Sequence, residues 1–312
     1  MTAVWIDARL DDDATRAALH KGDIVILAPT PASRAMAELA RDMLEKAFAP
    51  HHPETVHEHL TPEEVAALLA TLKPTFIHHP DNKKLIPQLM TEHGVDVDKL
   101  YFDVPRLRSA YPSHFLTTGI AYAFHPHRDT WYSAPQCQIN WWFPIYPLKA
   151  DNCMGFYPRY FAEPVANNSE IYNYYDWNTK NRASAAAHVK SDTREQPKPQ
   201  QSLEPVTVRY IPPPGGIILF SGSQLHESVP NITGVARYSI DFRTVHMDDL
   251  LRGLGAPNVD NRSTGTTMRD YLNARTLAHI PEEIVAKYDD GTAGDGKVLN
   301  YNEVVKGQVA AE

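Results

Sequence analysis

The sequence feature that most constrains the fold is a series of short apolar and aromatic runs, broken by Pro and Gly, that begins near residue 115. Three of these runs are QINWWFPI (138–145), GIILFSG (216–222) and ARYSIDFR (236–243). Short runs of this composition between turn residues are typical of an all-β sandwich or barrel. The chain has 25 prolines among 312 residues, which favours loops and short strands over long helices. We therefore predict a mainly β core over residues 113–245.

Alternation along these runs predicts which faces are buried, because successive side chains of a strand point to opposite sides. Residues 216–222 are apolar on both faces, which predicts a strand buried on both sides. Residues 138–145 have one apolar face, and the other carries Gln138, Asn140 and Trp142. In 236–243 the face opposite the apolar one carries Arg237, Ser239, Asp241 and Arg243. Charged side chains on a strand that otherwise looks central need a reason, since burying an unpaired charge is unfavourable.

Helices are predicted on both sides of the core, and residues 1–312 are predicted to form a single domain. Thr30-Pro31, after the predicted strand IVILA (24–28), and the capping box from Thr61 to Glu64 each predict a helix start, and neither helix is expected to carry chemistry. Helices are also expected in MRDYLNARTL (268–277) and PEEIVAKY (281–288). The predicted parts are an N-terminal α/β flank (1–112), the core (113–245) with a lid-like insert (165–205), and a C-terminal helical segment (246–312).

Composition argues against several classes of protein. The formal net charge of −8 would repel a phosphate backbone, so no nucleic-acid partner is expected. Two cysteines, Cys137 and Cys153, are too few for a disulfide framework or a Cys-based zinc module. No run approaches the roughly 20 apolar residues of a membrane helix, and nothing resembles a signal peptide. We predict a soluble, cytoplasmic protein with a small-molecule substrate and no membrane partner.

The 15 histidines raise the question of a metal, and spacing selects among them. The clusters at 51–59 and 78–79 have no carboxylate or cysteine at an established ligand spacing, so we expect them to be loops. His127 and Asp129 lie two apart, so on an extended strand both side chains project to the same side. His226 follows the strand 216–222. Two histidines and one carboxylate form the facial triad of non-haem Fe(II) sites.

Two further observations refine this constellation. His125 shares a strand face with His127, but the Glu that a cupin metal motif would next require is replaced by Trp131 or Tyr132, so His125 is expected to be structural. Eleven residues after His226, Arg237 and then Ser239 lie on one strand face. A guanidinium can hold a carboxylate by paired hydrogen bonds, which a lysine cannot do.

The segment PGGIILFSGSQLHESVPNITGVARYSIDFR (214–243) resembles the Fe(II)/2-oxoglutarate-dependent oxygenases, most of all their phytanoyl-CoA dioxygenase-like branch. NWWFPIYPLKADNCMGFYPRYF (140–161) is also similar, although NCMGFYPRY departs from the family's Asn-Gly and Pro-Gly-Ser-His. The resemblance implies a double-stranded β-helix core of jelly-roll, cupin-like type. It implies that Fe(II) is bound by His127, Asp129 and His226, and that the distal carboxylate of 2-oxoglutarate is bound by Arg237 and Ser239.

The activity implied is that of a dioxygenase that consumes O2 and 2-oxoglutarate, releases succinate and CO2, and hydroxylates or desaturates a small molecule. Related halogenases have Gly or Ala in place of Asp129, which favours hydroxylation here. Gln138 and Asn140 are expected to line the cosubstrate pocket, and the substrate-side candidates are Trp131, Tyr132, Trp142, Tyr175 and Arg243. Arg243 is expected near the rim, to meet an anionic substrate or a surface carboxylate. A cupin-like metal-binding protein without oxygenase turnover remains the alternative, but it would not need a carboxylate clamp at Arg237.

Overall fold

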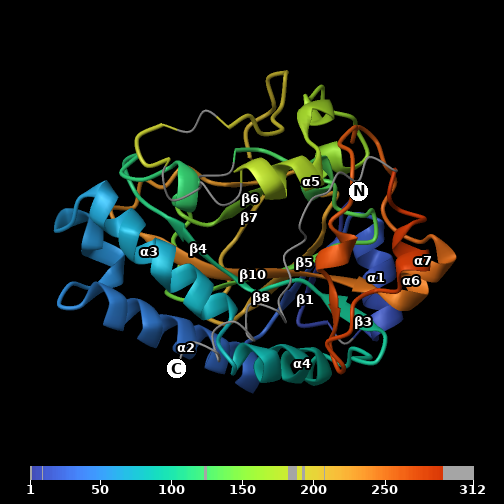
Figure 1. Ribbon diagram of the computed structural model, residues 1–312, viewed down its shortest axis with the longest axis horizontal. Coiled ribbons are helices and arrows are strands. Elements are labelled where there is room, and N and C mark those ends of the chain that lie inside the picture. Colours follow the sequence, from blue (N-terminus) through green and yellow to red (C-terminus); the bar gives the residue numbers. More distant parts are fainter. Residues whose placement is uncertain are drawn as a thin grey trace.

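The computed structural model describes residues 2–8, 10–122, 125–181, 188–191, 194–206 and 208–290. Within these residues, eight strands form one mixed sheet in the order β1-β2-β8-β5-β10-β3-β11, with β4 also paired to β10. A second sheet has the order β7-β6-β9. Figure 1 shows β6 and β7 on one side of the large sheet and the helices α2 and α4 on the other. The chain is therefore β-rich and layered, as the short apolar runs predict.

The strands are short, apart from β10. Those of the large sheet are β1 (Val4–Ile6), β2 (Ile24–Leu27), β3 (Leu100–Phe102), β4 (Arg106–Ala110), β5 (Ile139–Pro144), β8 (Ile217–Ser221), β10 (Arg237–His246) and β11 (Leu272–Asn273). Those of the small sheet are β6 (Met154–Phe156), β7 (Val208–Tyr210) and β9 (His226–Ser228). Phe156 of β6 packs on Phe220 of β8 with ring centroids 5.1 Å apart, so the two sheets are in contact through their inner faces.

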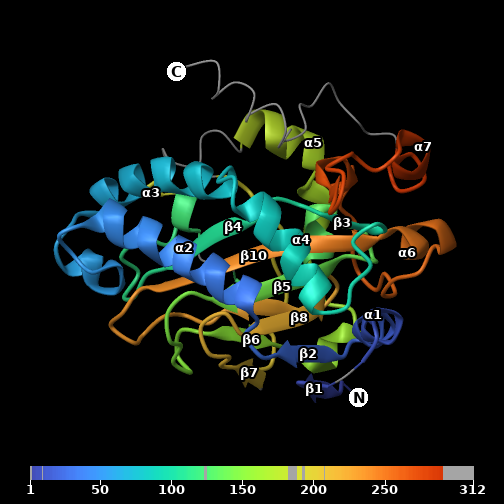
Figure 2. The same cartoon turned by 90° about the horizontal axis from the view of Figure 1, so that it is seen from below.

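The helices lie around the sheets, and α2 and α3 begin where the sequence predicts. They are α1 (Asp12–His20), α2 (Pro31–Phe48), α3 (Pro62–Ile77), α4 (Asn82–Glu92), α5 (Tyr174–Asp176), α6 (Met247–Arg252) and α7 (Glu282–Val285). Thr30 and Thr61 each cap their helix in a capping box, with proline in the first turn. In Figure 2, α2, α3 and α4 lie together over the large sheet. Among the described residues, no helix is long and apolar enough to span a membrane.

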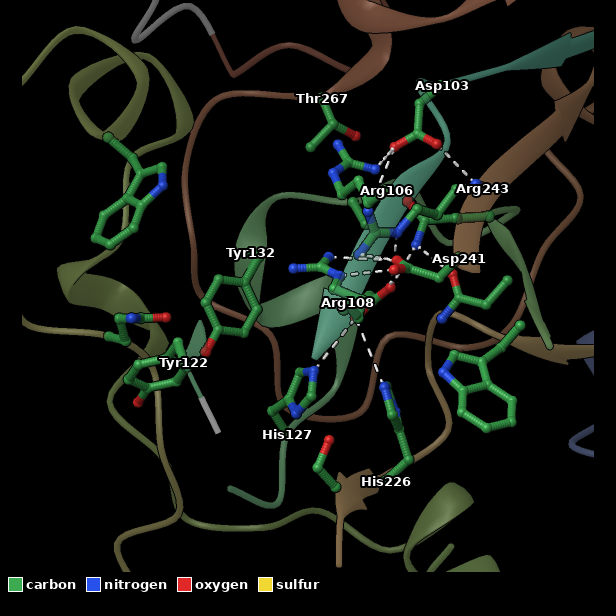
Figure 3. Close-up of a pocket in the computed structure, with 18 of the residues that line it drawn as sticks. Asp103, Arg106, Arg108, Tyr122, His127, Tyr132, His226, Asp241, Arg243 and Thr267 are labelled. Carbon is green, nitrogen blue, oxygen red and sulfur yellow. Dashed lines mark hydrogen bonds and ion pairs between the residues drawn. The ribbon is translucent and has the colours of Figure 1, made fainter. Parts of the chain in front are cut away.

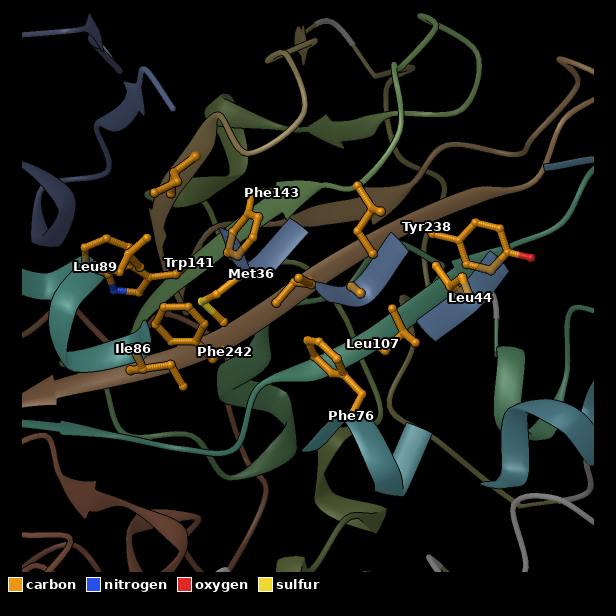
Figure 4. Close-up of a cluster of buried hydrophobic side chains, with 14 of the residues drawn as sticks. Met36, Leu44, Phe76, Ile86, Leu89, Leu107, Trp141, Phe143, Tyr238 and Phe242 are labelled. Atoms are coloured by element: carbon orange, nitrogen blue, oxygen red, sulfur yellow. The ribbon is translucent and has the colours of Figure 1, made fainter. Parts of the chain in front are cut away.

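The apolar faces of the central strands form the main core against these helices. Tyr238, Ile240 and Phe242 of β10 are all fully buried, and the alternate residues of β5 join them. Figure 4 shows Phe242 beside Trp141, with Met36 of α2 and Ile86 of α4 nearby. The predicted alternation is confirmed on both strands. β8 is buried on both faces, since Ile217 and Leu219 belong to this core and its other face contacts the small sheet.

The C-terminal part differs from the predicted secondary structure. Residues 268–277 form a 3₁₀ turn (Met268–Asp270) and the strand β11, not a helix. β11 pairs with β3, and the side chain of Asn273 then accepts from the backbone N–H of Arg275 and Thr276, which makes a turn. In 281–288 the helix is the single turn α7. The ASAAA part of the predicted lid (183–187) lies outside the described residues.

Candidate active site

Three predicted ligands, His127, Asp129 and His226, come together, and their ligand atoms lie within 4.8 Å of one another. The backbone holds the two histidines side by side, because the N–H of each donates to the carbonyl of the other at 2.9 Å. Asp129 begins a 3₁₀ turn (Asp129–Tyr132), so the prediction of an extended strand through this residue is wrong. The turn still brings Oδ1 of Asp129 to 3.5 Å from Nε2 of His127 and 3.9 Å from Nε2 of His226 (Figure 3).

A backbone carbonyl fixes the orientation of each histidine ring. Nδ1 of His127 lies 2.8 Å from the carbonyl oxygen of His125, and Nδ1 of His226 lies 2.9 Å from that of Gln224. A carbonyl can only accept, so Nδ1 of each ring carries a proton and Nε2 is the nitrogen that faces the site. Burial and the neighbouring His127 lower the pKa of His226 to about 3, which keeps this ring neutral. Imidazole nitrogens and a carboxylate are suitable donors for Fe(II).

Asp129 is buried and remains ionised. Burial alone would raise its pKa, but Arg243 and the two histidines hold the pKa well below its usual value. Nε of Arg243 lies 3.5 Å from Oδ2 of Asp129, and Gln138 donates to the same oxygen at 2.9 Å. The hydroxyl of Tyr271 donates to Gln138 at 2.7 Å. These contacts hold Oδ2 and leave Oδ1 facing the histidines.

The same contacts change the predicted roles of Gln138 and Arg243, whereas Asn140 lies at the cavity as predicted. Both amide hydrogens of Gln138 go to Asp129 and Asn140, so Gln138 orients Asp129 and has no N–H to offer a cosubstrate. Asn140 lines the same cavity, with its side-chain oxygen turned to Gln138. Arg243 is not at an exposed rim: it lies within 3.5 Å of the carboxylates of Asp103, Asp129 and Asp241. The connection between β3 and β4 places Asp103 beside Arg243, whose backbone N–H donates to the Asp103 carboxylate at 2.7 Å.

Arg237 lies in the same cavity and has spare hydrogen-bonding capacity. Its Nη2 donates to Ser228 at 3.2 Å, and its guanidinium stacks over Trp142 at 5.6 Å from the ring centroid. Nε of Arg237 and the hydroxyl of Ser239 are buried and have no hydrogen-bond partner among the residues that the structure describes. Burial lowers the pKa of Arg237 to about 10, which still leaves it charged. Buried donors without partners are unfavourable, and an incoming carboxylate would satisfy them.

The metal-ligand group and Arg237 line one cavity of about 320 Å³, which is large enough for small molecules, whereas the predicted Ser239 is fully buried and is not among the lining residues. Tyr132 contacts the ring of His127 edge-on with centroids 5.6 Å apart, so this predicted residue faces the site. Trp142 lines the cavity next to Arg237. Trp131 and Tyr175 do not line it, contrary to prediction. Trp131 points away because the 3₁₀ turn replaces the strand alternation, and its Nε1 donates to Asp260 at 2.7 Å.

Two other predicted positions have structural contacts. The hydroxyl of Tyr175 donates to Asp289 at 2.8 Å, in a cluster with Arg269 away from the cavity. Both ring nitrogens of His125 are occupied, by the hydroxyl of Tyr122 at 3.0 Å and the carbonyl of Pro197 at 2.9 Å. His125 is therefore positioned as a structural residue. Among the described residues, no other group of three or more His, Cys, Asp or Glu could hold a metal ion.

The sequence analysis missed cavity residues in the N-terminal flank. α3 contributes Lys73, and β4 contributes Arg106 and Arg108. For β4 the sequence does contain a signal, which is the alternation of its side chains. Leu107 belongs to the core, so Arg106 and Arg108 on either side of it lie on the opposite face of the strand. α3 gives a weaker signal, because a single lysine among apolar residues is usual for a surface helix. Residues 165–181 of the insert also line the cavity, through the four side chains of Tyr172, Tyr174, Trp177 and Asn178.

No family model and no curated protein matches the chain, whereas several solved structures do. The non-heme monooxygenase ThoJ in a nickel complex is 15% identical over 84% of this chain and 87% of that chain, with a TM-score of 0.36. EvdO2 from Micromonospora carbonacea var. aurantiaca is 14% identical over 78% and 93%, with a TM-score of 0.41. The alpha-ketoglutarate-dependent carbocyclase SnoK from nogalamycin biosynthesis is 13% identical over 80% and 94%, with a TM-score of 0.37.

Non-heme monooxygenases and 2-oxoglutarate-dependent enzymes are thus among the solved structures similar to this chain. Similarity at this level does not establish the chemistry of the chain, which depends on its own side chains.

Proposed function

We propose that the chain is a non-haem Fe(II)- and 2-oxoglutarate-dependent dioxygenase of the phytanoyl-CoA dioxygenase-like branch, which hydroxylates or desaturates a small molecule. The observation that carries the proposal is one cavity that contains both the His127, Asp129 and His226 group and Arg237, whose Nε lacks a partner. A protein that only binds a metal would not need a buried guanidinium, such as that of Arg237, with a hydrogen-bond donor still available to a ligand. The two contacting sheets support a double-stranded β-helix core for this site.

Each residue of the cavity has a role that follows from its contacts. His127, Asp129 and His226 would hold Fe(II), and Arg237 with Ser239 would hold the distal carboxylate of 2-oxoglutarate. Bound Fe(II) and 2-oxoglutarate would supply O2 activation and the oxidation of a C–H bond, with succinate and CO2 as products. Gln138 and Arg243 keep Asp129 oriented and ionised. The buried surroundings exclude bulk water from the reacting groups.

The test has a binding part and a turnover part. Anaerobic addition of 2-oxoglutarate to the Fe(II)-loaded protein should produce a visible absorption band, and admission of O2 with ascorbate should release succinate. If neither the band nor succinate is observed, even with a broad substrate panel, the oxygenase proposal is wrong. Metal binding without either response would support the alternative of a cupin-like metal-binding protein.

A matched pair of variants tests the ligand set. Asp129→Ala removes the single carboxylate donor and should weaken Fe(II) binding at least about tenfold, as measured by metal content after dialysis. His125→Ala removes a ring whose two nitrogens already have other partners, so this variant should retain its iron. Loss of iron in His125→Ala with retention in Asp129→Ala would show that the ligand set is misassigned.

A further inference from the structure

Lys73 is a second cation of the cavity without a carboxylate partner. It lies on α3 and lines the cavity, and its Nζ donates a short hydrogen bond to the carbonyl of Ile120. Among the described residues, no carboxylate lies within ion-pair distance of this ammonium group. An ammonium has three donors, and the Ile120 carbonyl uses one of them. The remaining donors are available to a molecule in the cavity.

The nearby arginines are different, because each is already matched by an acid. Nε of Arg108 donates to Asp241 at 2.6 Å, and its Nη2 donates to the other oxygen at 3.3 Å. Arg106 donates to Asp103 at 2.5 Å. When protonated, Lys73 therefore adds to this side of the cavity a positive charge that no acid of the described residues matches within ion-pair distance. Burial and the repulsion of Arg108 lower the pKa of Lys73 to about 7, and a bound anion would reverse this shift.

Lys73 and Arg237 contact different residues of the cavity wall. Arg237 contacts Ser228 of the small sheet and Trp142 of β5. Lys73 instead contacts Ile120, in the 3₁₀ turn Gly119–Ala121 that leads to Tyr122. The two cations therefore reach the cavity from different elements, Lys73 from α3 and Arg237 from β10.

An aromatic wall leads away from the metal-ligand group. The ring of Tyr132 lies 5.6 Å from that of His127 and 5.1 Å from that of Tyr172. The ring of Tyr172 lies 5.7 Å from that of Trp177, and Tyr122 and Tyr174 also line the cavity. Figure 3 shows Tyr122 and Tyr132 on the same side of the cavity as His127. Such a wall suits a flat apolar body.

We propose that this cavity binds a substrate that is an apolar, aromatic monocarboxylic acid, with its carboxylate on Lys73 and its ring along Tyr132 and Tyr172. A single unmatched positive charge suits a carboxylate monoanion better than a phosphate dianion. This substrate class rests on the proposed function, which places the reacting C–H bond beside His127 and His226. Lys73 would then be a specificity-determining residue that touches the substrate.

The experiment uses the full chain loaded with Fe(II) and saturated with 2-oxoglutarate under argon, so that Arg237 is occupied and no turnover occurs. The probes are phenyl-substituted carboxylic acids from benzoate to 5-phenylpentanoate, each with its matching primary amide, and phenyl phosphate. Calorimetry measures each dissociation constant. We expect at least one acid to bind at least about tenfold more tightly than its amide, since hydrogen bonds to charged groups contribute about 1.5–3 kcal/mol.

The variants assign this preference to Lys73. Lys73→Met should bind acid and amide equally, Lys73→Arg should keep most of the preference, and the exposed control Lys84→Met should behave as wild type. The proposal is overturned if no acid is preferred over its amide, if the preference survives in Lys73→Met, or if phenyl phosphate binds more tightly than every acid. Acid binding that is seen without 2-oxoglutarate but lost in its presence would place the acid at Arg237 and also overturn the proposal.

The same experiment separates this inference from the proposed function. An acid preference that depends on Lys73, in a protein that does not bind 2-oxoglutarate, would support the anion site and contradict the oxygenase. Binding of 2-oxoglutarate without any acid preference would contradict the anion site alone.

Discussion

The two faces of β10 consist of alternate residues of one strand and have opposite properties. Tyr238, Ile240 and Phe242 belong to the apolar core that packs against the helices, and all three are fully buried. On the other face, Asp241 and Arg243 belong to an ion-pair network that reaches Asp129. Core and site are therefore separated by one residue along the chain and by the thickness of the sheet.

This comparison shows how a strand can combine stability with chemistry. Apolar burial favours folding in proportion to the area removed from water, whereas each buried charge opposes folding unless it is paired. The apolar face of β10 can therefore stabilise the sheet, and the sheet in turn holds the charged face in position. Substitutions on the two faces should separate stability from ligand binding, and the size of that separation can be measured.

The largest effect is expected from Phe242→Ala on the apolar face. Phe242 is fully buried and stacks on Trp141 with ring centroids 5.7 Å apart. Truncation should lower the free energy of unfolding by about 3–5 kcal/mol, measured by urea denaturation. The affinity of the folded variant for 2-oxoglutarate should stay within about twofold of wild type. Phe242→Leu is the control, with a smaller stability loss. If 2-oxoglutarate affinity falls in step with stability, the two faces are not independent.

The second effect is expected from Arg237→Met on the polar face. Loss of the charge-assisted hydrogen bonds should weaken 2-oxoglutarate binding about 100-fold, measured by anaerobic calorimetry with Fe(II). The free energy of unfolding should be unchanged or higher, because the variant no longer buries a guanidinium with an unpartnered Nε. Arg159→Met changes an exposed arginine and should alter neither quantity. An Arg237→Met variant with normal 2-oxoglutarate affinity would show that the cosubstrate carboxylate is bound elsewhere.

The two faces were also unequally predictable from the sequence. The apolar face of β10 and the capped starts of α2 and α3 follow from local patterns, and the structure confirms them. The juxtaposition of His127, Asp129 and His226 was predicted from spacing and resemblance, although Asp129 reaches it through a turn. That turn also explains why Trp131 points away from the cavity.

What the sequence could not predict depends on contacts between distant segments. Arg243 is 114 residues from Asp129 and meets it only because β10 and β5 pair near the loop that carries the ligands. Lys73 lies in a helix whose pattern indicates only a buried and an exposed side. No local pattern shows that the partly buried end of its side chain enters a cavity formed by β4, β10 and the insert. Such residues become visible only when the cavity itself is known.

The smallest effect is expected from Lys73→Met, which extends the comparison of two faces to the helix α3. Leu69 and Leu72 of this helix belong to the core, whereas Lys73 lines the cavity. Because the pKa of Lys73 is lowered to about 7 in the folded chain, the unfolded chain binds more protons between about pH 7 and 10.4. The free energy of unfolding of the ligand-free wild type should therefore rise with pH in this window, and the contribution should be absent in Lys73→Met. At pH 7 the variant should be more stable by about 1 kcal/mol, a value reduced because the side chain is only partly buried. The difference in free energy of unfolding between Lys73→Met and wild type should be smaller at pH 9 than at pH 7, as measured by urea denaturation. Equal pH slopes in the two proteins would show that Lys73 imposes no such penalty and that the polar side of α3 resembles an ordinary surface.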